Sequence, residues 1–281
     1  MICKNIKMIV VDLDGTLLTK VDDMSEETVA VFRRVKEAGI LPVIATGRLE
    51  KESVFAADKI GAKEYIITMN GLMIYDYQKD AQIYHRCMER ESACRIFDQL
   101  DRYDVFYQVY AGNETHTTAR AVRSLPYAGM SPSYMEFYAN TRQIPGGMRE
   151  YVERENLEVD KMFVSIEDDA LRNKIRSLAD QVPGVQTLSS GVCYLEILPE
   201  GADKCHAIEF LEEYTGISSQ NMMIIGDSEN DVKMLRMAGL AVAMGNGCSE
   251  AKAAADYIAP DNLHDGVSVA IRKFIFGEDV S

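Results

Sequence analysis

Residues 6–16 read IKMIVVDLDGT, and the rest of the chain is organised around this stretch. Its first part, residues 6–11, is rich in β-branched side chains and predicts a buried strand that ends at Asp12. Asp12 and Asp14 lie two residues apart, and Gly15 after them lets the backbone turn sharply. Two carboxylates placed in this way are costly unless a cation neutralises them. We therefore expect a metal ion, and chemistry, at the end of this strand.

Composition narrows the class of protein. The 281 residues are 47% apolar, which is ordinary for a globular protein of one or two domains. No apolar run reaches about 18 residues and no signal peptide precedes the first strand, so we expect a cytoplasmic protein without a membrane partner. The net charge of -14 disfavours nucleic acid as a partner, because the field of the protein repels polyanions. The six cysteines form no C-x-x-C pair and predict neither a disulfide framework nor a zinc site.

Strands and helices alternate after the first motif. Apolar runs at residues 40–45 and 65–68 predict two further buried strands, and helical patterns precede each of them. Strand–helix alternation with short connections is typical of a doubly wound, mainly parallel α/β sheet of the Rossmann type. Ligands bind at the carboxyl ends of such strands, so we expect Thr46 and Asn70 to lie near Asp12 and Asp14.

The pattern changes after residue 71. A hairpin is predicted over residues 72–85, and residues 86–190 mix hairpins with helices, which indicates an inserted α+β domain with an antiparallel sheet. Alternation resumes with a predicted core strand at residues 192–198, followed by the helix that begins near Lys204 and a buried strand at 222–225. We therefore assign residues 1–85 and 191–281 to the core and residues 86–190 to the insertion.

Charged residues gather at the predicted strand ends. The set comprises four carboxylates and one lysine: Asp12, Asp14, Asp227, Asp231 and Lys204. A hard divalent cation with oxygen ligands relieves this imbalance, and magnesium fits best, with Asp12 and Asp227 donating carboxylate oxygens. Asp231 lies four residues after Asp227, so on a helix it faces the same way and either supports the site or binds the ion.

Such a cluster suits phosphoryl chemistry. A carboxylate beside magnesium and a lysine can attack a phosphoryl group and form an aspartyl-phosphate. A second carboxylate can protonate the leaving oxygen and then activate water. Thr46 would donate a hydrogen bond to the phosphate, and Lys204 would neutralise it.

Four motifs in this order resemble those of the haloacid dehalogenase-like phosphatases. They are DLDGT at residues 12–16, the threonine of ATGR at Thr46, the lysine of GADK at Lys204 and GDSEND at residues 226–231. The NG at 70–71, GNG at 245–247 and DGV at 265–267 are similar to the Cof-type branch, which carries a large α/β cap. Cys205, where glycine is common, and Leu72, where a small residue is usual, depart from the pattern.

The resemblance implies roles for single residues. It makes Asp12 the nucleophile, Asp14 the general acid/base and a magnesium ligand through its main-chain carbonyl, and Asp227 a further ligand. Gly47 and Asn230, which belong to the same motifs, are assigned to phosphate or substrate binding. The implied substrate is a small phosphomonoester, such as a sugar phosphate or a related metabolite, whose leaving group would be selected by the cap.

Alternatives remain open at this point. A phosphomutase would share the nucleophile, a receiver-type signalling domain would share the acids and the sheet, and a sugar-phosphate binder would lack turnover. Arg48 is either a contact for the leaving group or a solvated arginine at the start of a helix. Asn70 is either a substrate-facing amide or an Asn-Gly turn former.

Overall fold

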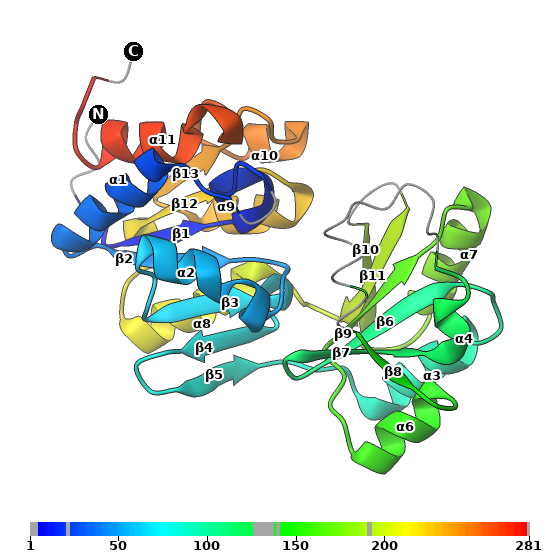
Figure 1. Ribbon diagram of the computed structural model, residues 1–281. Coiled ribbons are helices and arrows are strands. Elements are labelled where there is room, and N and C mark those ends of the chain that lie inside the picture. The colour runs from blue at the N-terminus through cyan, green and yellow to red at the C-terminus, as the bar shows by residue number, and fades with distance from the viewer. Residues whose placement is uncertain (1–4, 21–22, 126–137, 139–140, 190–192, 280–281) are drawn as a thin grey trace. The chain divides into compact units, whose positions relative to one another are not determined.

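The computed structural model describes residues 5–20, 23–125, 138, 141–189 and 193–279 (Figure 1). The chain forms two compact units, of which the first comprises Met1–His85 with Asp203–Ser281 and the second Arg86–Ala202. Each unit contains its own sheet and its own hydrophobic core. Within the described residues, no helix is both long and apolar enough to cross a membrane.

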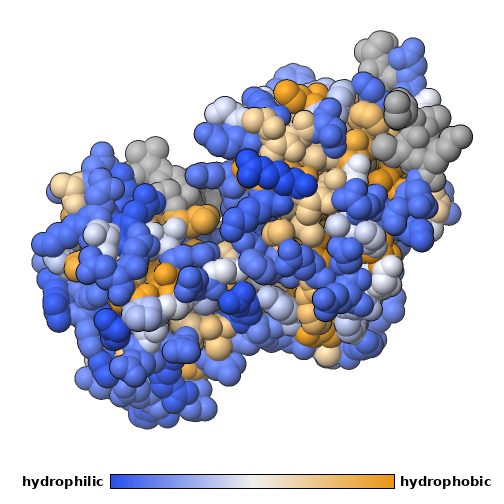
Figure 2. Space-filling model, turned by 180° about the vertical axis from the view of Figure 1, so that it is seen from behind, coloured by the Kyte–Doolittle hydropathy of each residue, from blue (hydrophilic) through white to orange (hydrophobic). Residues whose placement is uncertain are grey.

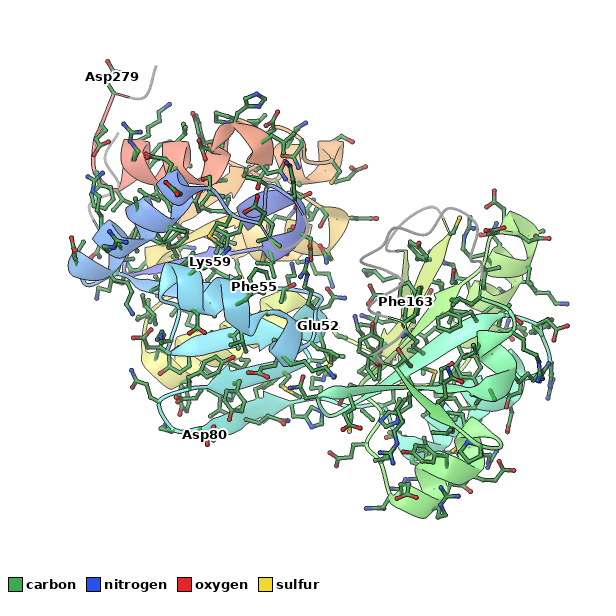
Figure 3. All side chains as sticks on the ribbon, viewed as in Figure 1. Glu52, Phe55, Lys59, Asp80, Phe163 and Asp279 are labelled. Atoms are coloured by element: carbon green, nitrogen blue, oxygen red, sulfur yellow. The ribbon has the colours of Figure 1, made fainter. Side chains whose placement is uncertain are left out.

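The first unit is built on an eight-stranded sheet, mostly parallel, with helices on both faces (Figure 1). In spatial order its strands are β14 (Tyr257–Ile258), β13 (Leu240–Ala243), β12 (Met222–Gly226), β1 (Met8–Val11), β2 (Leu41–Ala45), β3 (Tyr65–Thr68), β4 (Met73–Asp76) and β5 (Ala81–His85). Only the β3–β4 and β4–β5 pairs are antiparallel. The predicted hairpin thus extends the core sheet, and Asp80 lies in its turn (Figure 3).

Alternate residues of the central strand β1 pack into two hydrophobic cores, one on each face of the sheet. Ile9 and Val11 pack with one face, which is covered by α1 (Glu26–Glu37), α2 (Val54–Ile60) and α11 (Gly266–Phe274). Met8 and Val10 pack with the other face, under α8 (Lys204–Thr215), α9 (Val232–Met237) and α10 (Ser249–Ala253). A strand buried on both faces has to be apolar throughout, which explains the continuous apolar run at the start of the chain.

The second unit is a mainly antiparallel sheet with its main core between one face and three helices. Its strands, in spatial order, are β10 (Val185–Ser189), β11 (Tyr194–Pro199), β9 (Lys161–Ser165), β6 (Phe106–Ala111), β7 (Glu114–Thr118) and β8 (Arg142–Ile144), and only β7 and β8 pair in parallel. Helices α3 (Arg90–Leu100), α6 (Met148–Glu155) and α7 (Asp169–Ala179) supply the core residues opposite this sheet, and α4 (Ala119–Val122) follows β7. Phe163 lies on β9 (Figure 3).

One predicted strand belongs to the other unit. The run at 192–198 was expected to resume the core sheet, but β11 pairs antiparallel with β9 and β10 in the second unit. The structure divides the chain between Ala202 and Asp203, while the predicted boundary at 190–191 lies outside the described residues. The prediction for this strand was wrong because a strand at the centre of any buried sheet has the same apolar composition.

Surface composition follows the charge of the sequence. Figure 2 shows one face of the molecule, on which hydrophilic side chains predominate and hydrophobic ones occur in smaller groups. The large hydrophobic side chains that are exposed among the described residues are Tyr214, Ile258 and Leu263.

Candidate active site

The first carboxylate of the site lies at the centre of the sheet. The backbone N–H of Asp12 donates to the carbonyl of Ile225 over 3.0 Å, so the ladder between β1 and β12 extends one residue beyond β1. Asp12 is 5% exposed. The chain then turns through Leu13–Leu17 and the C-terminal cap Leu18, called here together the β1 turn. Asp12 is therefore held between the ends of two strands that are far apart in sequence.

Gly15 lets the β1 turn approach Asp227. Its φ of 82° lies in the left-handed region, and a Cβ at this position would come within 2.5 Å of Asp227 Oδ2. Thr16 Oγ1 donates to Asp227 Oδ1 over 2.8 Å. Glycine is required here both by the backbone conformation and by the carboxylate beside it.

Lys204 joins two carboxylates inside the protein. Its Nζ lies 2.5 Å from Asp12 Oδ1 and 2.7 Å from Asp231 Oδ1, and its side chain is fully buried. Asp231 Oδ2 accepts the backbone N–H groups of Asp227 and Ser228, at 2.9 and 3.0 Å. Asp231 thus uses one oxygen to hold the lysine and the other to shape the loop that carries Asp227.

Burial governs the electrostatics of this cluster. It raises the pKa of Asp12 well above its ordinary value; Lys204 opposes this effect, and Asp231 and Asp227 add to it. Burial also raises the pKa of Asp227, against the hydrogen bond from Thr16. Burial alone would lower the pKa of Lys204, but the charges of Asp12 and Asp231 outweigh it and raise that pKa. The acids outnumber the lysine, so the cluster lacks positive charge.

The donor set fits a hard divalent cation. Carboxylate oxygens of Asp12, Asp227 and Asp231 all lie within 4.8 Å of one another. All three ligand atoms are oxygens, which magnesium prefers in proteins. Both oxygens of Asp231 are already bound, one to Lys204 and the other to two N–H groups, which leaves Asp12 and Asp227 as the carboxylates that could hold a cation.

The ends of β2, β3 and β12 bring further predicted residues together. Thr46 is fully buried, and its hydroxyl accepts the N–H of Arg48 over 3.1 Å. Asn230 Nδ2 donates to Asn70 Oδ1 over 3.1 Å, and a Cβ at Gly47 would lie 2.8 Å from the same oxygen. Asn70 has a φ of 59° and is 4% exposed, so it both forms the turn and presents a buried amide to its neighbours. Gly47, Asn70 and Asn230 therefore form one polar group.

Arg48 is bound to the second carboxylate of the first motif. Its Nε donates to Asp14 Oδ2 over 2.8 Å and its second terminal nitrogen to Asp14 Oδ1 over 2.6 Å. The Asp14 side chain is 57% exposed and that of Arg48 only 19%. Of the two alternatives for Arg48, the solvated arginine is wrong. Nothing in the sequence predicted its partner.

The comparisons with known proteins agree with this geometry. A family model described as haloacid dehalogenase-like hydrolase matches residues 9–271. The chain belongs to this family. This haloacid dehalogenase-like hydrolase is 28% identical over 271 residues to the 5-amino-6-(5-phospho-D-ribitylamino)uracil phosphatase YcsE of Bacillus subtilis, with 96% of each chain covered. It is 27% identical over 275 residues to YitU, a phosphatase of the same name from the same organism, covering 95% of this chain and 97% of the relative.

A solved structure supports the same assignment. A haloacid dehalogenase-like hydrolase from Bacteroides thetaiotaomicron matches with a TM-score of 0.80 at 27% identity, covering 95% of this chain and 99% of the other. The predictions of this family, of its α/β fold and of an enzyme are thereby confirmed. The relatives are named phosphatases, which is the class that the sequence predicted.

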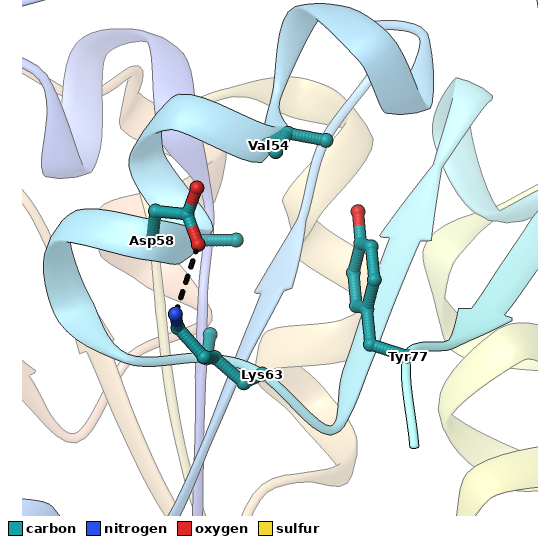
Figure 4. Close-up of a pocket in the computed structure, with 6 residues that line it drawn as sticks. Val54, Asp58, Lys63 and Tyr77 are labelled. Atoms are coloured by element: carbon teal, nitrogen blue, oxygen red, sulfur yellow. Dashed lines mark ion pairs between the residues drawn. The ribbon is translucent and has the colours of Figure 1, made fainter. Parts of the chain in front are cut away.

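A separate pocket in the hydrolase has none of the motif residues in its lining. It measures about 230 Å³ and is lined by Val54, Ala57, Asp58, Ala62, Lys63 and Tyr77 (Figure 4). Its two charged side chains pair with each other, Lys63 Nζ to Asp58 Oδ1 at 3.3 Å. Its tyrosine hydroxyl donates to Glu50 Oε1 over 2.6 Å. The remaining lining is apolar, so this pocket offers less to a phosphate than the strand ends do.

Proposed function

We propose that this protein hydrolyses a small phosphomonoester with Mg²⁺, through an aspartyl-phosphate formed on Asp12. The observation that carries the proposal is the setting of Asp12, which is buried at the end of β1 with Lys204 Nζ at 2.5 Å and Asp227 in the same acidic cluster. A buried carboxylate beside a fixed cation is suited to act as a nucleophile toward an anionic group.

The first half of the reaction transfers the phosphoryl group to the enzyme. The carboxylate of Asp12 forms a bond to phosphorus while the bond from phosphorus to the leaving oxygen breaks, and Asp14 gives its proton to that oxygen. Bound between Asp12, the main-chain carbonyl of Asp14 and Asp227, Mg²⁺ would screen the negative charge of the phosphate. Lys204 also neutralises charge near Asp12, and the buried Thr46 hydroxyl donates to a phosphate oxygen. We assign Gly47 and Asn230 to the same phosphate.

The second half restores the enzyme. Asp14, now a carboxylate, takes a proton from water, whose oxygen attacks phosphorus. The bond between phosphorus and Asp12 then breaks, and inorganic phosphate leaves. Asp14 thus returns to its starting protonation state, so one water is consumed for each ester hydrolysed.

The substrate is proposed to be a sugar phosphate or a related phosphorylated metabolite. The names of the relatives support a phosphate carried by a sugar alcohol. The net charge of -14 supports a small ligand captured by local cations rather than a polyanion such as nucleic acid. We further propose a cytoplasmic setting, in which such metabolites are found.

Phosphate release from a panel of phosphorylated metabolites, with 4-nitrophenyl phosphate as a generic ester and Mg²⁺ present, tests the proposal. We expect the wild type to release phosphate and Asp12→Asn to release none above background while remaining folded. Release at the wild-type rate by a folded Asp12→Asn protein would overturn the assignment. A coupled assay that found isomerised ester instead of free phosphate would establish a mutase.

A further inference from the structure

Two asparagines from the C-terminal part of the chain bind the β1 turn. Asn246 Nδ2 donates to the carbonyl of Gly15 over 2.8 Å, and Asn262 Nδ2 donates to the carbonyl of Leu18 over 2.7 Å. The backbone N–H of Asn262 donates to Asn246 Oδ1 over 3.0 Å. This last bond fixes which way the Asn246 amide points, so that its NH₂ group faces Gly15.

The loop that carries Asn246 also binds the opposite side of the acidic cluster. The backbone N–H of Cys248 donates to the carbonyl of Asp227 over 2.8 Å. A Cβ at Gly247 would lie 2.8 Å from that carbonyl oxygen and 3.1 Å from the Cα of Asp227. Residues 245–248 therefore contact the β1 turn through Asn246 and the Asp227 segment through Gly247 and Cys248.

The separation of these two segments matters for a cation. Of the proposed ligands, Asp12 and the main chain of Asp14 belong to the segment that follows β1, and Asp227 belongs to the segment that follows β12. Mg²⁺ demands near-ideal octahedral geometry at about 2.0–2.1 Å, so a small shift between the two sides weakens its binding steeply. Groups that hold metal ligands in place are worth about 10- to 100-fold in metal affinity.

We propose that Asn246 is a positioning residue that sets the affinity of the site for Mg²⁺, by fixing the β1 turn at the distance from Asp227 that the ion requires. The inference rests on the proposed cation site and goes beyond it, because the Asn246 amide is bound to Gly15 and Asn262 and would act on the ion only through the position of the turn. Asn262 orients Asn246 through its backbone, so its own side chain is not needed for this effect.

Isothermal titration calorimetry of Mg²⁺ into the purified, metal-free full chain tests this without any phosphate ester. We expect Asn246→Ala to weaken Mg²⁺ binding by about tenfold. The matched control is Asn262→Ala, which also removes one amide bond to a carbonyl of the same turn, but at Leu18, and keeps the backbone N–H that orients Asn246. We expect its Mg²⁺ affinity to stay within about twofold of the wild type.

Activity provides a second readout. The Mg²⁺ concentration for half-maximal release of 4-nitrophenol should rise in Asn246→Ala by the factor found in calorimetry, with a smaller change in the rate at saturating Mg²⁺. A general loss of structure would lower the saturating rate instead. Thermal unfolding in EDTA checks that both variants are folded.

Two results would overturn the inference alone. One is a folded Asn246→Ala protein that binds Mg²⁺ like the wild type, and the other is an equal loss of affinity in both variants. Failure of the proposed function is a separate outcome: it is seen as phosphate release by Asp12→Asn. A wild-type protein that bound no Mg²⁺ would overturn the cation site on which both depend.

Discussion

Arg48 donates hydrogen bonds to both carboxylate oxygens of Asp14, with N–O distances of 2.8 and 2.6 Å. A planar guanidinium that binds a carboxylate through two nitrogens fixes its orientation as well as its position. Asp14 is otherwise largely exposed, so Arg48 determines where its carboxyl group points, and one of the two oxygens has to release Arg48 before it can carry the proton of a general acid. The two residues come from the ends of neighbouring strands, β1 and β2.

This pairing predicts a dependence on the leaving group. In Arg48→Met, hydrolysis of an alkyl phosphate such as glycerol phosphate should fall by about 100-fold or more in kcat/KM, since general acid catalysis contributes about 10²–10⁴-fold. Hydrolysis of 4-nitrophenyl phosphate should fall far less, because 4-nitrophenolate leaves without a proton. Arg48→Lys keeps the positive charge but cannot bind both carboxylate oxygens in the same way, so its loss of activity should lie between zero and that of Arg48→Met. Equal losses on both esters would contradict an effect through Asp14.

The raised pKa values of Asp12 and Asp227 predict how metal-free protein responds to pH. A carboxyl group whose pKa is higher in the folded than in the unfolded state favours folding while protonated, so its contribution is lost as pH rises above the ordinary value of 3.8. The melting temperature in EDTA should therefore fall as pH rises toward neutrality, and Mg²⁺ should restore it most at neutral pH.

The double variant Asp12→Asn with Asp227→Asn is the control for this prediction. It removes both groups, so its melting temperature in EDTA should depend less on pH and should not respond to Mg²⁺. Identical pH profiles for the wild type and the double variant would show that these two groups do not govern the response.

Gly71 predicts a steric link to Lys204. Its φ is 90°, and a Cβ there would lie 2.2 Å from the carbonyl oxygen of Asp203 and 2.9 Å from the Cα of Lys204. Gly71→Ala should therefore displace the start of α8, destabilise the protein by roughly 2 kcal/mol or more and lower phosphate release. Urea unfolding and steady-state kinetics measure the two effects.

Gly112→Ala is its matched control. Gly112 also has a positive φ, 61°, but an added Cβ would meet nothing within 4 Å. It should show only the backbone strain, about 1 kcal/mol, with unchanged kinetics. If both variants lost stability equally and Gly71→Ala kept full activity, the contact with Asp203 would be unimportant.

We expect the ionised carboxylate of Asp203 to stabilise the folded protein and this stabilisation to disappear in acid. Its side chain caps α8 by accepting the N–H of His206 over 2.9 Å, and Lys233 Nζ lies 2.7 Å from its other oxygen. Burial opposes the effect, but these bonds outweigh it and lower the pKa of Asp203. The stabilisation is therefore present above the ordinary value of 3.8 and is lost as pH falls through the lowered pKa.

Two variants of Asp203 separate the effect of its capping hydrogen bond from the effect of its charge. Asp203→Ala should cost about 1 kcal/mol at neutral pH, whereas Asp203→Asn retains a good capping oxygen and should cost less. Urea unfolding at pH 7 and pH 3 measures both. A wild-type advantage over Asp203→Asn that persisted unchanged at pH 3 would contradict the role of the charge.

The sequence predicted the parts of the fold that repeat a local rule. Apolar runs that end in Asp12, Thr46 and Asp227 marked the strand ends, because a strand buried on both faces has to be apolar. The assignment of β11 to the core sheet was wrong, because an apolar composition indicates that a strand is buried but does not indicate which sheet it belongs to. The pairs Arg48–Asp14 and Asn246–Gly15 could not be predicted, since each depends on how two separate turns are oriented in space.

The position of β1 has a consequence for synthesis of the chain. β1 lies between β2, which follows it closely, and β12, whose Met222 pairs with Met8. During translation, one edge of β1 therefore remains without its partner β12 while the whole of Arg86–Ala202 is synthesised. That contiguous unit can finish folding during translation, whereas the acidic cluster at the end of β1 can close only after β12 has been made, and one edge of β1 is unpaired until then.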